Sequence, residues 1–125
     1  MSRVRVLLAD DQTIVLQGLE LLLRESFQLV GAVSDGWALI EAAKQLKPDV
    51  IVTEIGMPLL NGLDAIRELK KEGITAKIVV LTMQAGATFA AQAFKAGASG
   101  FLLRELGAFR WACHRIILDS SVQSG

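Results

Sequence analysis

The stretch that decides the fold is Pro48-Asp49-Val50-Ile51-Val52-Thr53-Glu54-Ile55-Gly56-Met57-Pro58, followed by Asn61-Gly62. It indicates an apolar strand that ends on a carboxylate, Glu54, and opens into a turn rich in Gly, Pro and Asn. An earlier apolar run, residues 4–9, ends in the same way on Asp10-Asp11. Two strands of one parallel sheet would therefore bring three acids to a common edge. Mg²⁺-assisted phosphoryl chemistry requires such an arrangement.

Apolar segments rich in β-branched residues alternate along the chain with segments of helical periodicity. The pattern predicts strands at 3–9, 28–34, 49–54, 76–82 and 99–103, and helices at 13–25, 36–47, 62–72, 86–96 and 106–118. Such an alternation is typical of a βαβ series around a parallel sheet. The third and fourth strands are nearly unbroken apolar runs, so we expect helices on both of their faces and a central place in the sheet.

The chain of 125 residues has about the length of one domain. We expect a domain over residues 1–119 and a linker or frayed tail over 120–125, which is polar and small. Pro48 should end the second helix, Asn61-Gly62 should open the third, and Gly97 should close the fourth.

Thirteen basic residues balance thirteen acidic ones, so the chain has no general attraction for nucleic acid or for anionic lipid. No apolar run approaches the roughly 18 residues that span a bilayer, and no secretory signal is recognisable. Cys113 is the only cysteine, which excludes an internal disulfide and favours a reducing compartment. These features predict a cytoplasmic protein without direct nucleic acid or membrane binding.

Polar residues follow the ends of four predicted strands. They are Asp10 and Asp11 after the first strand, Glu54 after the third, Thr82 after the fourth and Arg104 after the fifth. Functional crevices of open parallel sheets lie beyond the carboxyl ends of the strands. Loops are polar in any case, and Asp11 could also be the N-cap or a first-turn acid of the first helix, a role compatible with metal binding. The convergence of all five residues favours a functional site.

With these residues in place, the chain resembles a receiver domain of bacterial two-component response regulators over nearly its whole length. The resemblance is carried by Leu8-Ala9-Asp10-Asp11, Pro48-Asp49-Val50-Ile51-Val52 with Met57-Pro58 and Asn61-Gly62-Leu63, Val80-Leu81-Thr82, and Ala96-Gly97-Ala98-Ser99-Gly100-Phe101-Leu102-Leu103. The absence of Pro after the basic position is similar to receivers that carry a C-terminal LuxR-type helix-turn-helix domain. The implied fold is a single flavodoxin-like (βα)5 unit, doubly wound, with strand order 2-1-3-4-5.

The resemblance also implies a phosphorelay switch. In that family an Asp after the third strand accepts a phosphoryl group from a sensor histidine kinase, and Glu54 holds that position here. The acid pair Asp10 and Asp11, with the carbonyl of Gly56, would hold Mg²⁺ beside it. Arg104 stands where a Lys contacts the phosphate. Thr82 and Phe101 match the pair that shifts on activation, although Phe101 could also be simply core.

Two positions, Glu54 and Arg104, depart from the family pattern. A Glu carboxylate reaches about 1.5 Å farther than that of Asp, and a displacement near ~1 Å can slow a positioned transfer on the order of a hundredfold. Efficient phosphorylation of Glu54 is therefore not expected, while its charge can partly imitate a phosphorylated Asp. An Arg guanidinium can grip a carboxylate through two hydrogen bonds, so we expect Glu54 and Arg104 to pair and to reduce the dependence on Mg²⁺.

The resulting prediction is a binding switch rather than a turnover enzyme. Homodimers could form through the face of the fourth helix, fifth strand and fifth helix, with Phe89 and Trp111, or through the first and fifth helices, with Ile14 and Leu21. A degenerate receiver that only docks a partner is an alternative.

Two other classes of protein fit the sequence less well. A Mg²⁺-dependent phosphotransferase or phosphatase of the haloacid dehalogenase type would need Asp-x-Asp after the first strand. A flavin or nucleotide binder would need a Gly-rich or hydroxyl-rich loop there. The residues present, Asp10-Asp11-Gln12-Thr13, supply neither.

Overall fold

The structure is a computed structural model that describes residues 3–82 and 87–103. The elements in chain order are β1 (Arg5–Ala9), α1 (Thr13–Leu23), β2 (Gln28–Val33), α2 (Gly36–Leu46), β3 (Val50–Thr53), α3 (Gly62–Lys71), β4 (Lys77–Thr82), α4 (Ala87–Ala96) and β5 (Gly100–Leu103). The predicted fifth helix, at 106–118, and the predicted tail lie outside these ranges. In the described part of the chain, no helix combines the length and apolar composition needed to cross a membrane.

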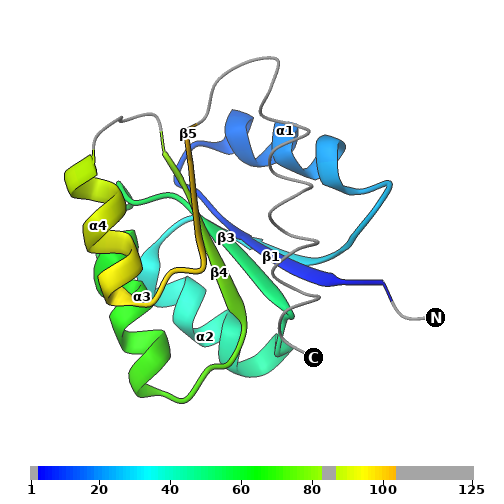
Figure 1. The fold of residues 1–125 in the computed structure, drawn as a ribbon. Coiled ribbons are helices and arrows are strands. Elements are labelled where there is room, and N and C mark those ends of the chain that lie inside the picture. Colours follow the sequence, from blue (N-terminus) through cyan, green and yellow to red (C-terminus); the bar gives the residue numbers. More distant parts are fainter. Residues whose placement is uncertain (1–2, 83–86, 104–125) are drawn as a thin grey trace.

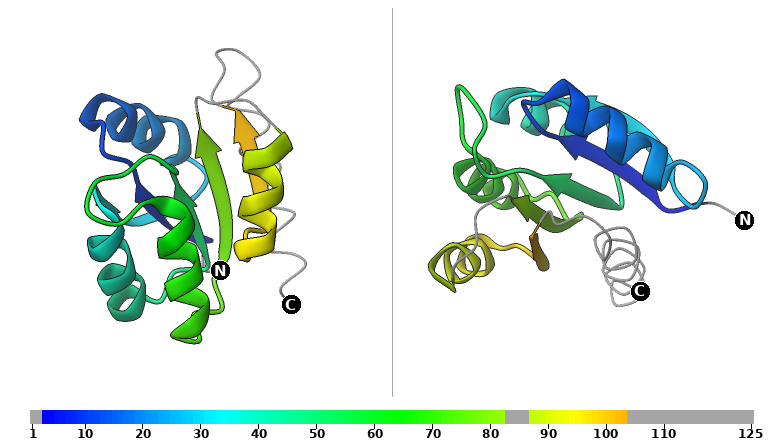
Figure 2. Two further views of the ribbon diagram at one scale, coloured as in Figure 1. Left: turned by 90° about the vertical axis from the view of Figure 1, so that its left-hand side faces the viewer. Right: turned by 90° about the horizontal axis from the view of Figure 1, so that it is seen from above.

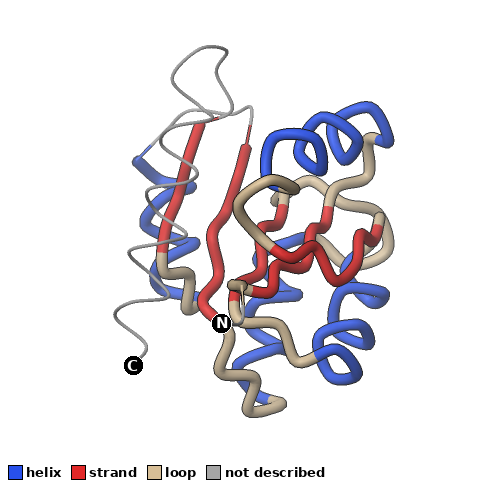
Figure 3. Tube along the Cα trace, turned by 90° about the vertical axis from the view of Figure 1, so that its right-hand side faces the viewer, coloured by secondary structure: helices blue, strands red, loops and turns tan. Residues whose placement is uncertain are grey.

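The strands form one parallel sheet in the order β2-β1-β3-β4-β5 (Figure 1). This confirms the predicted fold class and strand order, and it puts β3 at the centre. The helices lie on both sides of the strand layer (Figures 2 and 3). α1 packs on one face, whereas α2, α3 and α4 pack on the other.

Two apolar cores follow from this layering, because successive side chains of a strand point to opposite faces. On the α1 face, Val6, Leu8, Val50 and Val52 of the strands join a buried cluster with Leu19, Leu23 and Phe27. On the other face, Leu7, Ile51 and Ile78 join a cluster with Leu39, Ile66 and Leu69. Both faces of β3 are therefore buried, which explains its unbroken apolar sequence.

The helix boundaries have identifiable causes. The side chains of Asp35 and Asn61 accept hydrogen bonds from backbone N–H groups at the starts of α2 and α3, as helix N-caps do. Lys47, with φ of 49°, and Gly97, with φ of 124°, end α2 and α4 in left-handed conformations. At the start of α1 the N-cap is Gln12 without a side-chain bond, so the alternative role of Asp11 as an N-cap or first-turn acid is wrong.

An ion pair links α2 to the end of α3 on the surface. The Nζ of Lys44 lies 3.1 Å from Oε2 of Glu72. The hydrogen bond from Lys44 to Glu72, followed by the charge of that carboxylate, raises the pKa of Lys44 above its usual 10.5. Both side chains are well exposed, so we expect only a small contribution to stability.

Candidate functional site

The register of the two central strands brings Asp10 and Glu54 to the same edge of the sheet. Ala9 of β1 pairs with Thr53 of β3, and the N–H of Glu54 donates a 2.9 Å hydrogen bond to the carbonyl of Ala9. The N–H of Asp10 continues the ladder on the other side, to Val33 at 3.0 Å. Each acid is therefore the first residue past its strand.

The three acids differ in their environment. Asp10 and Glu54 retain only 1% and 9% of their exposure, whereas Asp11 is exposed. A buried carboxylate must be compensated by hydrogen bonds or by charge. Oδ1 of Asp10 accepts a 2.9 Å bond from the N–H of Gln12, which fixes the turn into α1.

The carboxylate of Glu54 lies over the loop that follows it. Its Oε1 accepts a 2.8 Å hydrogen bond from the N–H of Ile55 and a longer one, 3.4 Å, from the N–H of Gly56. Successive backbone N–H groups that point at one oxygen form a small anion-binding nest. One oxygen of Glu54 thus occupies a place built for negative charge.

Close backbone packing holds this loop in position. The N–H of Gly62 donates a 2.7 Å bond to the carbonyl of Ile55. A Cβ on Gly62 would lie 2.2 Å from the carbonyl oxygen of Glu54, and one on Gly36 would lie 2.1 Å from that of Leu60. Only glycine fits at these two helix starts, so α2 and α3 both press directly on the segment after Glu54.

Leu59 is the unusual residue of the loop. It has a left-handed backbone, with φ of 67°, and its side chain is 80% exposed. A leucine in this conformation costs roughly 1–2 kcal/mol relative to an extended or right-handed one. The hydrogen bonds and glycine contacts on either side hold it there.

Comparison with known proteins identifies the family of this chain. Residues 6–110 match the response regulator receiver domain. The chain belongs to the response regulator receiver family. It is 34% identical to the chemotaxis protein CheY of Thermotoga maritima, over 80% of this chain and 84% of that protein.

Other relatives agree with this assignment. The transcriptional regulatory protein LnrK of Bacillus subtilis is 33% identical over 84% of this receiver domain, which covers 49% of LnrK. The receiver thus spans about half the length of the transcriptional regulators that it matches. The signal receiver domain of the putative response regulator NarL from Mycobacterium tuberculosis superposes with a TM-score of 0.90 at 26% identity, over 97% of this chain and 98% of that one.

The donor set of the receiver suits Mg²⁺ in its chemistry but is not assembled as a cluster. Carboxylates of Asp10, Asp11 and Glu54 and the carbonyl of Gly56 are the hard oxygen ligands that Mg²⁺ prefers. Within residues 3–82 and 87–103, however, no group of three or more Asp, Glu, His or Cys side chains is placed to hold a metal ion. The buried oxygens of Asp10 and Glu54 accept backbone N–H bonds instead. The ligand set therefore stays a prediction.

The other predicted site residues are placed to different degrees. Thr82 ends β4 and pairs with Leu103 of β5, so its backbone lies at the same sheet edge. Phe101 is partly buried and packs against the core of the α2–α4 face. Phe101 therefore contributes to the core. A coupled shift of Phe101 and Thr82 stays a prediction. Arg104 lies outside the described residues.

Sequence reasoning missed the contacts that shape the loop after Glu54. The hydrogen bonds from the N–H groups of Ile55 and Gly56 depend on the side-chain rotamer of Glu54, which no sequence pattern specifies. The glycines did carry a signal, because Gly36 and Gly62 each open a helix and glycine permits a close approach of backbone segments. The left-handed backbone of Leu59 had no such signal.

Proposed function

We propose that this receiver domain is a binding switch in which Glu54 imitates part of the charge of a phosphorylated Asp. Its output is a change in protein contacts, and it does not depend on phosphoryl transfer to residue 54. In a longer protein of the kind that it matches, this output would control transcription through a separate DNA-binding domain.

The observation that carries the proposal is the position of the Glu54 carboxylate. It is buried directly after β3, at the same sheet edge as Asp10, with Oε1 held by the N–H groups of Ile55 and Gly56. The extra methylene places a negative oxygen in the nest without any covalent modification. A single carboxylate carries one charge, against roughly two for a phosphate, so the imitation is partial.

Arg104 completes the proposed arrangement. A guanidinium that grips the Glu54 carboxylate through two hydrogen bonds would supply countercharge at the site and reduce its need for Mg²⁺. The proposed partners are a sensor histidine kinase or another receiver-binding protein, and a second copy of the chain. The exposed side chains of Ile14 and Leu21 on α1 support the availability of one of the two predicted dimer faces.

The first test asks whether Glu54 accepts a phosphoryl group. Wild type and Glu54→Asp are incubated with Mg²⁺ and acetyl phosphate, and intact mass spectrometry counts the added phosphoryl groups. We expect the Asp variant to be modified and the wild type to react on the order of a hundredfold more slowly, because its carboxylate is displaced by about a methylene. Rapid modification of the wild type at Glu54 would contradict the proposal.

The second test asks whether the Glu54 charge sets the conformation. Amide NMR spectra are compared for the wild type, Glu54→Gln, and Glu54→Asp with and without Mg²⁺ and beryllofluoride, a phosphoryl analogue. The Gln variant should resemble the Asp variant alone, and the wild type should resemble the Asp variant with beryllofluoride. If all four spectra differ only within the loop after residue 54, the domain is a docking module without a switch.

A further inference from the structure

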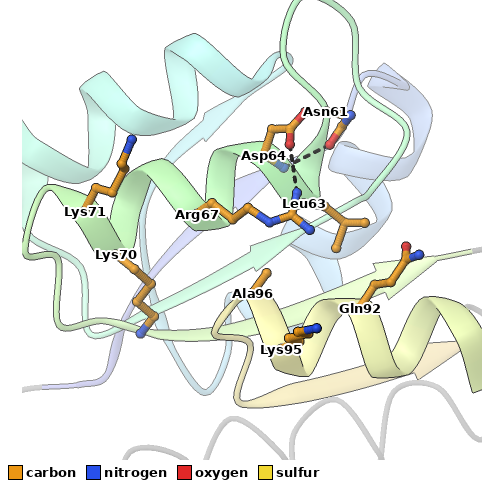
Figure 4. Close-up of a pocket in the computed structure, with 9 residues that line it drawn as sticks. All are labelled: Asn61, Leu63, Asp64, Arg67, Lys70, Lys71, Gln92, Lys95 and Ala96. Carbon is orange, nitrogen blue, oxygen red and sulfur yellow. Dashed lines mark hydrogen bonds and ion pairs between the residues drawn. The ribbon is translucent and has the colours of Figure 1, made fainter.

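A groove of ≈ 860 Å³ runs between α3 and α4, on the side of the molecule away from α1 (Figure 4). Its lining is Asn61, Leu63, Asp64, Arg67, Lys70, Lys71, Gln92, Lys95 and Ala96. Four of these residues are basic and one is acidic, although the whole chain has a formal net charge of zero. Positive charge is therefore concentrated at this groove.

The basic side chains converge from two helices. Arg67 and Lys70 are three residues apart on α3, so they share one face of that helix. Lys95 belongs to the last turn of α4. Figure 4 shows Arg67 extending into the space between the helices, while Lys71 points away from α4. The positive surface of the groove consequently comes mainly from Arg67, Lys70 and Lys95.

Acidic neighbours compensate only part of this charge. Oδ1 of Asp64 lies 2.8 Å from NH1 of Arg67, and Oδ2 of the same carboxylate accepts a bond from the side-chain amide of Asn61. Lys71 pairs loosely with Glu68, at 3.7 Å. Among the residues that the structure describes, Lys70 and Lys95 form no ion pair. Two exposed ammonium groups at one groove thus lack a countercharge within the described protein.

Lys70 is held at the groove by packing. A Cβ on Gly97 would lie 2.8 Å from Cε and 2.9 Å from Cγ of Lys70, so the methylene chain of the lysine crosses the glycine that ends α4. A lysine commonly buries its stem in this way while its ammonium stays in solvent. Because Gly97 limits the space on one side of the stem, we expect less side-chain entropy to be lost when the ammonium binds an anion.

We propose that the α3–α4 groove is a docking site for an acidic segment of a partner protein. Carboxylates of the segment would pair with Lys70 and Lys95, and an apolar side chain would contact Leu63 and Ala96 at the groove wall. The site is separate from Glu54, but α3 begins at Gly62, at the end of the loop after Glu54. A bound acidic segment would therefore contact α3, the helix that directly follows the loop after Glu54.

The size and composition of the groove favour a peptide over nucleic acid. Ten residues of α3 span about 15 Å, which leaves room for two or three carboxylates of a short segment. A protein whose DNA affinity depends steeply on salt makes about 6–10 phosphate contacts, and the four basic residues of this groove are fewer than that. Amide and apolar groups, from Asn61, Gln92, Leu63 and Ala96, make up the uncharged part of the wall.

The test uses the whole 125-residue chain and a fluorescein-labelled peptide of about twelve residues, (Glu-Leu-Glu-Ala)3, long enough to fill the groove. Fluorescence anisotropy measures affinity at low salt. Lys70→Glu/Lys95→Glu should weaken binding on the order of tenfold or more, since it replaces both attractions by repulsion. Amide NMR shifts caused by the peptide should centre on α3 and α4.

Lys47→Glu is the charge control for a single one of these reversals. Lys47 is exposed, lies at the end of α2 and is absent from the groove lining. It reverses one charge near a helix carboxyl end, as Lys70→Glu and Lys95→Glu each do alone, so it is compared with those single variants and shares any loss of helix-dipole stabilisation. We expect less than a twofold change in peptide affinity for this variant, with circular dichroism confirming that each variant is folded.

Several outcomes would overturn the proposal. They are no binding of the acidic peptide at millimolar concentration, equal binding of a peptide with Gln in place of Glu, and equal affinity of the wild type and the Lys70/Lys95 variant. Tighter binding of a short DNA duplex, lost in the same variant, would assign the groove to nucleic acid instead. Full displacement of the peptide by millimolar inorganic phosphate would assign it to a small anion.

Discussion

Gly62 controls how closely α3 approaches the backbone of Glu54. We expect Gly62→Ala to lower the free energy of unfolding by about 1–3 kcal/mol, because the new Cβ would lie 2.2 Å from the Glu54 carbonyl oxygen and 2.9 Å from the Ile55 Cα. Both neighbours are backbone atoms, so no side-chain rotation can relieve the contact. Urea denaturation followed by circular dichroism measures the loss.

Gly18 of α1 provides the control for that change. A Cβ at Gly18 would meet no atom within 4 Å, and replacing a mid-helix glycine by alanine usually stabilises by roughly 0.5–1 kcal/mol. The same chemical change should therefore have opposite signs at two positions. Equal effects at Gly62 and Gly18 would show that the approach of α3 to Glu54 is looser than the structure indicates.

At the residue scale, the sequence predicted which residues lie at the sheet edge but not how their side chains are oriented. Asp10 and Glu54 could be assigned to one sheet edge because each follows an apolar strand, and the register confirms that placement. The exposure of Asp11 and the bonds from Ile55 and Gly56 to Glu54 depend on backbone and side-chain dihedrals. A one-dimensional pattern of residue types does not specify these angles.

The helices show how element boundaries were recognised from capping residues. Asn61 and Gly97 mark the start of α3 and the end of α4, as their residue types predicted. The start of α1 was less predictable, since Gln12 is an uncommon N-cap and gives no side-chain bond. The α3–α4 groove could not be foreseen at all, because it depends on how two helices pack on the sheet.

The contrast between the two N-caps gives a test at this scale. Asn61→Ala should lower the free energy of unfolding by about 1 kcal/mol, because it removes the side-chain oxygen that accepts the 2.9 Å bond from the N–H of Asp64. Gln12→Ala should change it little, since no cap bond is lost. Thermal or urea denaturation compares the two directly.

A similar loss in both variants would contradict this assignment of the caps. Asn61 also donates to the Asp64 carboxylate, at 3.1 Å, so Asn61→Ser separates the two contributions. A serine keeps an oxygen that can cap the helix but lacks the amide donor. We expect Asn61→Ser to retain most of the stability that Asn61→Ala loses.

At the scale of the whole molecule, the fold class followed from the alternation of strands and helices. The unbroken apolar sequences of β3 and β4 predicted interior strands. For β3 the reason is confirmed, because both of its faces are buried. The strand order could not be predicted in the same way, because periodicity identifies strands but does not show which of them pair. The predicted order 2-1-3-4-5 therefore rested on resemblance to the family. The sheet confirms it.

Mg²⁺ should raise the free energy of unfolding of the domain only when residue 54 has the short side chain of an aspartate. A ligand that binds the native state alone stabilises it by RT ln(1 + [L]/Kd), so about 10 mM Mg²⁺ with a Kd near 1 mM contributes about 1.4 kcal/mol. We expect a gain of that order for Glu54→Asp and a much smaller one for the wild type. In the wild type, the Glu54 oxygen is held by the loop N–H groups and no cluster of three acids is assembled among residues 3–82 and 87–103.

Urea denaturation with MgCl2, or with NaCl at equal ionic strength, measures the difference between specific binding and screening. Asp10→Asn on the Glu54→Asp background should remove the gain, because it deletes one buried charge while keeping an oxygen that can accept the N–H of Gln12. Equal Mg²⁺ stabilisation of the wild type and Glu54→Asp would mean that Glu54 reaches a metal as readily as an aspartate does. The longer side chain would then have left the metal chemistry of the receiver intact.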